Sequence, residues 1–201
     1  MTRNTMLRRA HVLTLALFLT PGLAQASTIT YTAFLSGPAE APPNSSPATG
    51  FGSVTVDDSL HTMLVDLFFS GLIGDTTASH IHAATAAPGT GTAGVATTTP
   101  TFAGFPLGVT AGFYTRLLDM TLASSYNPAF VTANGGTPAS AEIALFSALA
   151  ADRAYLNIHT TVFPGGEIRG FLTPVPEPAA LILLGTGLLA VAARRRRKSR
   201  T

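Results

Sequence analysis

Cysteine and tryptophan are both absent from the 201 residues, and charged residues make up only 11% of the sequence. Without cysteine the chain has no disulfide and no thiol nucleophile, so a folded domain must be held together by its apolar core. Hydrophobic residues account for 46% of the sequence, which excludes a chain disordered by composition. The length allows one domain of ordinary size with short appendages.

Basic residues are scarce outside the two ends of the chain. Residues 1–26 contribute a charge of +3 and residues 176–201 contribute +5. The segment between them holds six Asp, three Glu, three Arg and no Lys, for a net charge of −6. Nucleic-acid binding requires clustered Lys and Arg that neutralise phosphates, so we expect no nucleic-acid partner.

Motifs typical of enzymes are also missing. The sequence has no G-x-S-x-G elbow and no Ser, His and acid residues in a recognisable triad order. The glycine-rich loop at 89–94 lacks the lysine of a phosphate-binding loop. We therefore predict that the protein is not an enzyme.

The sequence also shows no coiled-coil seam and no obvious apolar patch.

The N-terminus has the three parts of a secretory signal peptide. Arg8 and Arg9 precede an apolar run at 12–20, and Ala24 and Ala26 form a small-x-small cleavage site. The apolar run is too short to cross a membrane of about 30 Å. We predict a signal peptide over residues 1–26, removed by signal peptidase after Ala26.

The C-terminus combines a Pro-Glu-Pro triplet, an apolar segment and an arginine cluster. The triplet is Pro176, Glu177 and Pro178, and residues 179–193 carry no charge. Fifteen helical residues reach about 22 Å, which makes a marginal transmembrane helix. The arginines that follow this anchor would stay in the cytoplasm, which would leave the preceding part of the chain outside the cytoplasmic membrane. These arginines are Arg194, Arg195, Arg196 and Arg197.

This tail, residues 174–201, resembles a bacterial PEP-CTERM sorting signal. The resemblance implies recognition by an exosortase, transient anchoring in the inner membrane and cleavage near Pro176–Pro178. The domain would then be released or transferred to the cell surface or the extracellular matrix. A plain C-terminal membrane anchor is the alternative, and it also places the body outside the cytoplasmic membrane.

Residues 27–173 have the composition of an all-β domain. Segments rich in Thr, Val, Phe and Tyr alternate with clusters of Gly, Pro, Asn and Ser. A hairpin is expected around Asp58-Ser59, and one short helix is expected at 141–150. We predict a single antiparallel β-sandwich or barrel-like domain with that one helix. Strands are expected at 28–35, 51–58, 62–69, 79–83, 114–122, 153–162 and 167–172.

Three segments of this body resemble the CHRD domain, which is named after chordin. They are the opening at 34–43, the His-Ile-His segment at 79–83 and the close at 155–170 with Gly-Gly-Glu-Ile-Arg-Gly. The resemblance covers residues 30–172 and departs from the usual pattern at Ala83, where Gly is usual. It implies an extracellular β module, which in chordin is part of a growth-factor antagonist. We expect a binding or structural role, with an extracellular polysaccharide or surface protein as partner.

Histidines in this body suggest an alternative function. His80 and His82 lie two apart on a predicted strand and so share a face, and His159 could supply a third imidazole. Three histidines with an open position would suit Zn or Cu, as in an extracellular metalloprotein that could be redox-active. A His-x-His pair on a β-sandwich is similar to copper-zinc superoxide dismutase at the level of fold alone. The alternative is a purely structural role, in which these imidazoles hydrogen-bond to one another, to backbone carbonyls, or to Glu142 or Glu167.

Two further side chains are assigned structural roles. Glu167 and Arg169 lie two apart on a predicted strand, so we expect them to form an ion pair on one face. His61, close to the predicted hairpin turn, is expected to face solvent.

Overall fold

A computed structural model describes residues 28–175 and 186–189. The predicted signal peptide with Ala24 and Ala26, the triplet at 176–178 and the arginines at 194–197 lie outside the described residues. Of the predicted anchor at 179–193, four residues are described, and they are helical. Within the described ranges, no helix combines the length and apolarity needed to cross a membrane.

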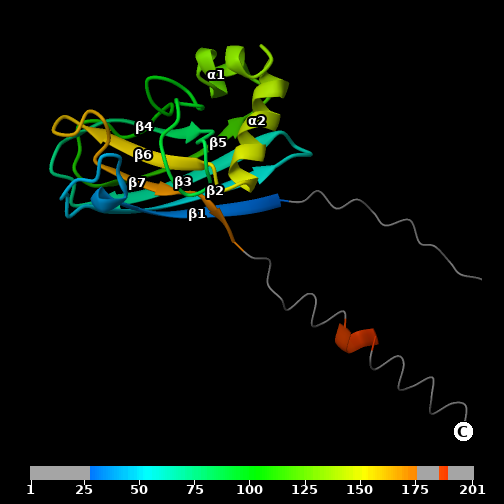
Figure 1. The fold of residues 1–201 in the computed structure, drawn as a ribbon, viewed down its shortest axis with the longest axis horizontal. Helices are drawn as coiled ribbons and strands as arrows, with labels where there is room; N and C mark the ends of the chain where they lie inside the picture. The colour runs from blue at the N-terminus through cyan, green and yellow to red at the C-terminus, as the bar shows by residue number, and fades with distance from the viewer. Residues whose placement is uncertain (1–27, 176–185, 190–201) are drawn as a thin grey trace, which may run out of the picture.

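The body is one curled antiparallel sheet with two α-helices beside it (Figure 1). The order across the sheet is β4-β6-β7-β1-β2-β3-β5, and β8 pairs with β1. The strands are β1 (Thr28–Ser36), β2 (Thr49–Asp57), β3 (Thr62–Ser70), β4 (Thr76–Ala83), β5 (Gly112–Asp119), β6 (Ala154–Thr160), β7 (Ile168–Phe171) and β8 (Thr173–Pro174). The helices are α1 (Pro128–Ala133) and α2 (Pro138–Ala150), with short 3-10 turns η1 (Gly37–Ala39) and η2 (Ala123–Ser125). The predicted all-β, barrel-like fold class is confirmed.

The predicted hairpin joins β2 and β3, which pair along their whole length. Asp57 lies opposite Thr62, at the end of the paired region. In the turn between them, the Asp57 carboxylate accepts hydrogen bonds from the backbone N–H groups of Ser59 and Leu60, at 3.0 and 2.9 Å. The side chain therefore closes the turn that its position in the sequence predicted.

Inward-facing side chains of the curled sheet form the core. Alternate residues of β1, β2 and β3 are buried, and β6 and β7 add to them from the other part of the sheet. Burying one large apolar side chain contributes about 1.5–3 kcal/mol, so this core replaces the missing disulfides. Its strand residues include Tyr31, Leu35, Val54, Met63, Val65, Leu67, Phe69, Leu156, Ile158 and Ile168.

The helices differ from the prediction in number and in length. Helix α2 begins at Pro138, three residues before the predicted start, because the Thr137 hydroxyl accepts the backbone N–H of Ser140 and caps the helix. Helix α1 is an addition, and Asn127 caps it in the same way. Both helices lie on the same side of the sheet in Figure 1.

Candidate functional site

The three histidines predicted as metal ligands lie together on the outer face of the sheet. His80 and His82 are on β4, and β6 runs beside them with His159 opposite Ala78 and Asn157 opposite His80. Cross-strand partners point to the same face, so this register brings all three imidazoles to one side of two neighbouring strands. One ligand atom from each lies within 4.8 Å of the other two. We call these three residues the histidine cluster.

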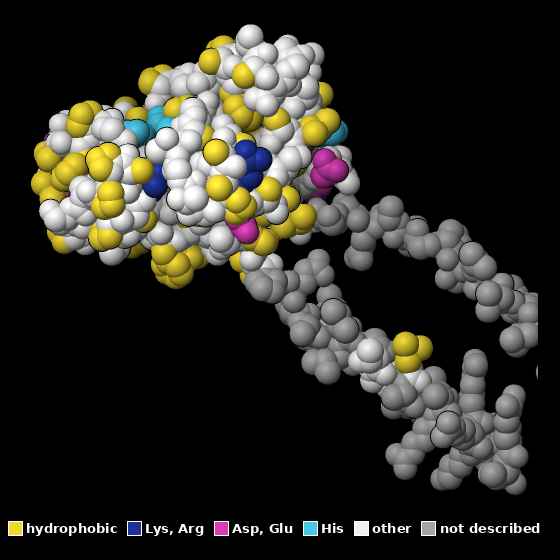
Figure 2. Space-filling model, viewed as in Figure 1, with side chains coloured by type: hydrophobic (Ala, Val, Ile, Leu, Met, Phe, Trp, Pro, Cys, Tyr) yellow, Lys and Arg dark blue, Asp and Glu magenta, His cyan; other side chains and the backbone are white. Residues whose placement is uncertain are grey.

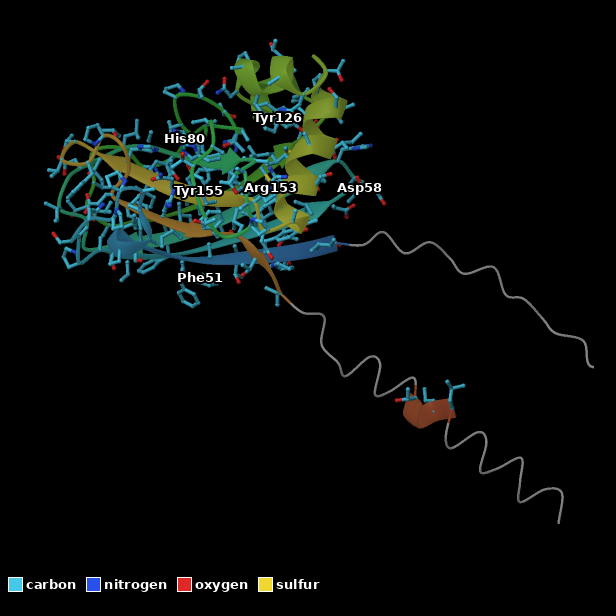
Figure 3. All side chains as sticks on the ribbon, viewed as in Figure 1. Phe51, Asp58, His80, Tyr126, Arg153 and Tyr155 are labelled. Atoms are coloured by element: carbon cyan, nitrogen blue, oxygen red, sulfur yellow. The ribbon has the colours of Figure 1, made fainter. Side chains whose placement is uncertain are left out.

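The cluster is packed tightly but reaches the surface. Ring centroids of His80 and His159 are 4.7 Å apart, those of His80 and His82 are 4.9 Å apart, and those of His82 and His159 are 6.0 Å apart. His80 and His82 are buried, whereas His159 is half-buried. Histidine side chains appear at the surface in Figure 2, in the region where Figure 3 labels His80. The cluster is therefore open to solvent on one side.

Backbone carbonyls orient two of the imidazoles. His82 Nδ1 lies 2.9 Å from the carbonyl oxygen of Ala93, and His159 Nδ1 lies 2.9 Å from that of Pro164. Because a carbonyl oxygen can only accept, each Nδ1 must carry the proton and each Nε2 is left with a lone pair. Hydrogen bonding to backbone carbonyls, one of the expected alternatives, is thus present for two of the three.

One ring nitrogen of each histidine in the cluster has no hydrogen-bond partner in the described part of the protein. These nitrogens are His80 Nδ1, His82 Nε2 and His159 Nε2, and all three atoms are buried. Buried polar atoms of side chains are nearly always paired, so three unpaired nitrogens in one place call for an explanation.

Burial keeps the imidazoles neutral. It lowers the pKa of His80 to about 3, together with the neighbouring His159 and His82, which act in the same direction. Burial also lowers the pKa of His82 to about 4, with His159 and Arg169 acting in the same direction and the Ala93 carbonyl opposing them. The pKa of His159 is lowered for the same reason, burial, although the Pro164 carbonyl opposes the shift. At neutral pH all three rings therefore offer unprotonated nitrogen atoms.

Tyr155 and Arg169 line one side of the cluster. The Tyr155 ring stacks on the His82 ring with centroids 4.7 Å apart and planes 4° apart. The Arg169 guanidinium lies over the same Tyr155 ring, 4.8 Å from its centroid. Arg169 donates to the carbonyl oxygens of Ala39 and Gly91, and its Nε lies 3.8 Å from Glu40 Oε2. The expected ion pair between Arg169 and Glu167 is therefore wrong, since the acid partner of Arg169 is Glu40.

Glu167 serves instead as a buried acceptor for a different set of donors. Its two oxygens accept from the hydroxyls of Ser46 and Thr160, both at 2.7 Å, and from the backbone N–H groups of Ile73 and Gly74, at 2.6 and 3.2 Å. Burial alone would raise the pKa of Glu167, but these four hydrogen bonds outweigh it and lower the pKa. Glu167 is a structural residue that ties three loops together.

Glu142, the other acid considered as a partner of the histidine cluster, lies on α2 and binds His61. His61 Nδ1 is 3.1 Å from both carboxylate oxygens of Glu142. The side chain of His61 is 53% exposed, so it faces solvent in part as expected while one ring nitrogen is held by this acid. In the described part of the chain, both candidate acids make their hydrogen bonds away from the cluster.

The outer face of the sheet also carries a row of exposed phenylalanines that sequence reasoning missed. Phe34 on β1 lies opposite Phe51 on β2, which lies opposite Phe68 on β3, which in turn lies opposite Phe113 on β5. Their exposed fractions are 81%, 40%, 59% and 69%. We call these four residues the phenylalanine row. It is an apolar patch, contrary to the expectation that no such patch exists.

Polar residues and a shallow depression accompany the phenylalanine row. Three of its rings line the depression together with Ser53 and Asp66. Phe34 and Phe51 pack edge to face with centroids 5.2 Å apart. Figure 3 shows Phe51 projecting from the sheet on the side away from the two helices. Exposed apolar patches of this kind mark interaction sites.

Comparisons with known proteins agree with both resemblances. A family model described as the CHRD domain matches residues 31–172, and one described as the PEP-CTERM protein-sorting motif matches residues 174–197. The sorting motif implies export, membrane-anchored sorting and processing by an exosortase, which is a membrane protease. Searches of the curated proteins and of the solved structures each found no match.

Proposed function

Because this chain belongs to the CHRD domain family and carries a PEP-CTERM sorting motif, we propose that it is a non-catalytic module of the cell surface or extracellular matrix that binds a neutral polysaccharide. The observation that carries this proposal is the phenylalanine row. The sorting motif supports placement outside the cytoplasmic membrane, where such polymers occur.

The geometry of the row suits a linear sugar polymer. Four rings on adjacent strands spaced by about 4.8 Å form a strip about 14 Å long. The electron-rich face of an aromatic ring attracts the weakly positive C–H groups that line one face of a sugar ring. A row of rings on neighbouring strands can therefore contact several consecutive sugar units at once.

Polar side chains beside the row can form hydrogen bonds with the hydroxyl groups of a sugar. Thr32, Ser53, Asp66 and Thr115 occupy the outer-face positions two residues along each strand from the phenylalanines. The Thr115 hydroxyl donates to Asp66 Oδ1 at 2.5 Å, which fixes that carboxylate next to the rings. Apolar rings flanked by hydroxyls and one carboxylate match the mixed character of a sugar chain.

Charge narrows the class of polymer. Residues 27–175 carry a net charge of −6, so an acidic polysaccharide or an anionic lipid surface would be repelled. An uncharged polymer is not subject to this repulsion. We therefore infer a neutral polysaccharide rather than an acidic one.

Affinity electrophoresis of the full-length protein tests this proposal. Gels would contain hydroxyethyl cellulose or dextran as neutral polymers, or polygalacturonate as an acidic one. We expect retardation by a neutral polymer, and binding weakened about 2- to 10-fold in Phe34→Ala or Phe68→Ala, because one aromatic contact contributes about 0.5–1.5 kcal/mol. The control is Leu60→Ala, which removes an apolar side chain that is 70% exposed but lies in the β2–β3 turn.

Several outcomes would contradict the proposal. Equal migration in all gels, or equal retardation of the Phe and Leu60 variants, would show that the row does not bind sugar. Binding to anionic vesicles or a concentration-dependent dimer, lost in the Phe variants, would assign the row to lipid or to a second copy. In cells, deletion of the gene should change surface attachment or matrix composition, and an unchanged phenotype would also contradict the proposal.

A further inference from the structure

We propose that the histidine cluster is a binding site for one Zn(II) or Cu(II) ion, ligated by His80 Nδ1, His82 Nε2 and His159 Nε2. This inference goes beyond the proposed sugar-binding function and rests on different residues. It explains why three buried ring nitrogens of neighbouring histidines have no hydrogen-bond partner among the described residues.

Two ligands are already oriented as metal-binding histidines usually are. In metalloproteins the nitrogen that does not bind the metal commonly donates to a backbone carbonyl or carboxylate, which fixes the ring and its tautomer. His82 and His159 show this arrangement toward the carbonyl oxygens of Ala93 and Pro164. The lone pairs therefore lie on His82 Nε2 and His159 Nε2, which have no hydrogen-bond partner among the described residues.

The spacing of the ligand atoms requires a modest contraction. Zn–N bonds of about 2.0–2.1 Å in a tetrahedral site place two nitrogens about 3.3 Å apart. One ring nitrogen from each histidine lies within 4.8 Å of the other two, so the widest pair must approach by up to about 1.5 Å. Small rotations of the side chains would have to supply this movement, and His159 is the least buried of the three.

The chemistry of the donors selects the metal. Imidazole suits Zn and Cu, whereas Ca²⁺ and Mg²⁺ require carboxylate or carbonyl oxygens. The described cluster contains nitrogen donors alone. Three protein ligands leave a fourth tetrahedral position, where water or an external ligand could bind.

The positive charge of Arg169 does not prevent cation binding. Its guanidinium is separated from His82 by the ring of Tyr155, which contacts both. The carboxylate of Glu40 lies 3.8 Å from Arg169 Nε and offsets the charge when ionised. Arg169 also donates a hydrogen bond to the carbonyl oxygen of Gly91, at 3.0 Å.

Metal titration of the full-length protein tests this inference. The purified protein would be treated with a chelator, dialysed, and titrated with ZnCl2 or CuCl2, with metal content measured by mass spectrometry and stability by thermal unfolding. We expect about one ion per chain and a higher Tm with metal. The key variant is His159→Asn, whose amide can still donate to the Pro164 carbonyl but which lacks the ligating nitrogen.

His61→Ala is the matched control, because it removes a histidine that lies outside the cluster and binds Glu142. We expect His159→Asn to bind metal at least about 100-fold more weakly, and His61→Ala to bind as the unchanged protein does. If His159→Asn fails to fold, His82→Gln provides the same test. Uptake of less than about 0.1 ion per chain would overturn the inference. Metal binding that survives both His159→Asn and His82→Gln would overturn it as well. If His159→Asn still binds the neutral polymer, the proposed sugar-binding function stands whether or not the metal site is confirmed.

Discussion

Replacing Glu167 by Gln tests how much the buried carboxylate stabilises the fold. The side chain is 0% exposed and accepts four hydrogen bonds, two on each oxygen. Gln keeps one accepting oxygen and places an amide NH2 against the other two donors. A hydrogen bond to a charged group contributes about 1.5–3 kcal/mol. Losing two should lower the free energy of unfolding by about 3–6 kcal/mol, a large part of the roughly 5–15 kcal/mol of a typical domain.

Thermal and urea unfolding at pH 7 would measure this loss. For a domain of this size, 1 kcal/mol shifts Tm by about 2–4 °C, so we expect Glu167→Gln to lower Tm by at least about 6 °C. Glu142→Gln is the matched control, because Glu142 is also buried and its described hydrogen bonds are to His61 alone. The control should cost about 1 kcal/mol.

The same pair of variants should respond differently to pH. The pKa of Glu167 is lowered by folding, below its ordinary value of 4.5. Its stabilisation is therefore present above the unfolded pKa and is lost as pH falls through the folded pKa. The difference in stability between the unchanged protein and Glu167→Gln should shrink below about pH 4. A Tm for Glu167→Gln that matches the control, or a gap that widens in acid, would refute this reasoning.

Two further predictions concern the residues around β7. Gly170→Ala would place its new methyl group against the carbonyl of Phe34, 2.8 Å from the carbonyl carbon, so it should destabilise the fold by about 1–3 kcal/mol or more in urea unfolding. Gly94→Ala, with nothing within 4 Å, should cost less. Burial raises the pKa of Glu40 from 4.5 to about 7 although Arg169 opposes it, so the folded state holds an extra proton between these values. Stability should fall as pH rises from about 4.5 to 7, and Glu40→Gln should flatten that profile in thermal unfolding; an unchanged slope would contradict the assignment.

Sequence patterns were sufficient for elements whose signals are local. The β2–β3 hairpin was predictable because residues alternate on both sides of a turn closed by Asp57. The start of α2 was also signalled, by Thr137 followed by Pro138 and Ser140, but the prediction relied on apolar composition and began too late. Asn127-Pro128 was a similar signal for α1, which is too short for composition to reveal.

The histidine cluster was partly predictable from the two-residue period of a strand. That period places His80 and His82 on one face, but it does not say which strand lies beside them. The neighbour depends on the register of β4 against β6, which pairs Ala78 with His159 across about 80 residues of sequence. The grouping of all three could be proposed from sequence, whereas the unpaired nitrogens and the carbonyl partners required the structure.

The same period misled the assignment of Glu167. Two side chains that are two residues apart on a strand share a face. However, β7 begins at Ile168, so Glu167 lies before the strand and its carboxylate accepts from Ser46 and Thr160. Arg169, which is on the strand, points to the outer face and meets Glu40. A strand boundary one residue away was enough to separate the expected pair.

The phenylalanine row could not be seen in the sequence because its members come from four strands. Each is a single apolar residue at an outward position, which is common and uninformative by itself. Alignment of the four depends on the registers of three strand pairs, which place each ring opposite the next. The patch is a property of the sheet rather than of any one segment.

Both proposed sites lie on the outer face of the sheet, yet the strand order keeps them apart. His159 is on β6 and Phe34, the row's member on the nearest strand, is on β1, with β7 between them. Two steps of about 4.8 Å separate these strands by about 10 Å along the sheet, and the other three phenylalanines lie on strands further away. Effects of substitutions more than about 7–10 Å apart usually add without coupling. Tyr155, which lies opposite both His82 and Phe171, belongs to the histidine side of this division. A loss of metal binding in one variant and a loss of sugar binding in another would therefore report on two independent sites.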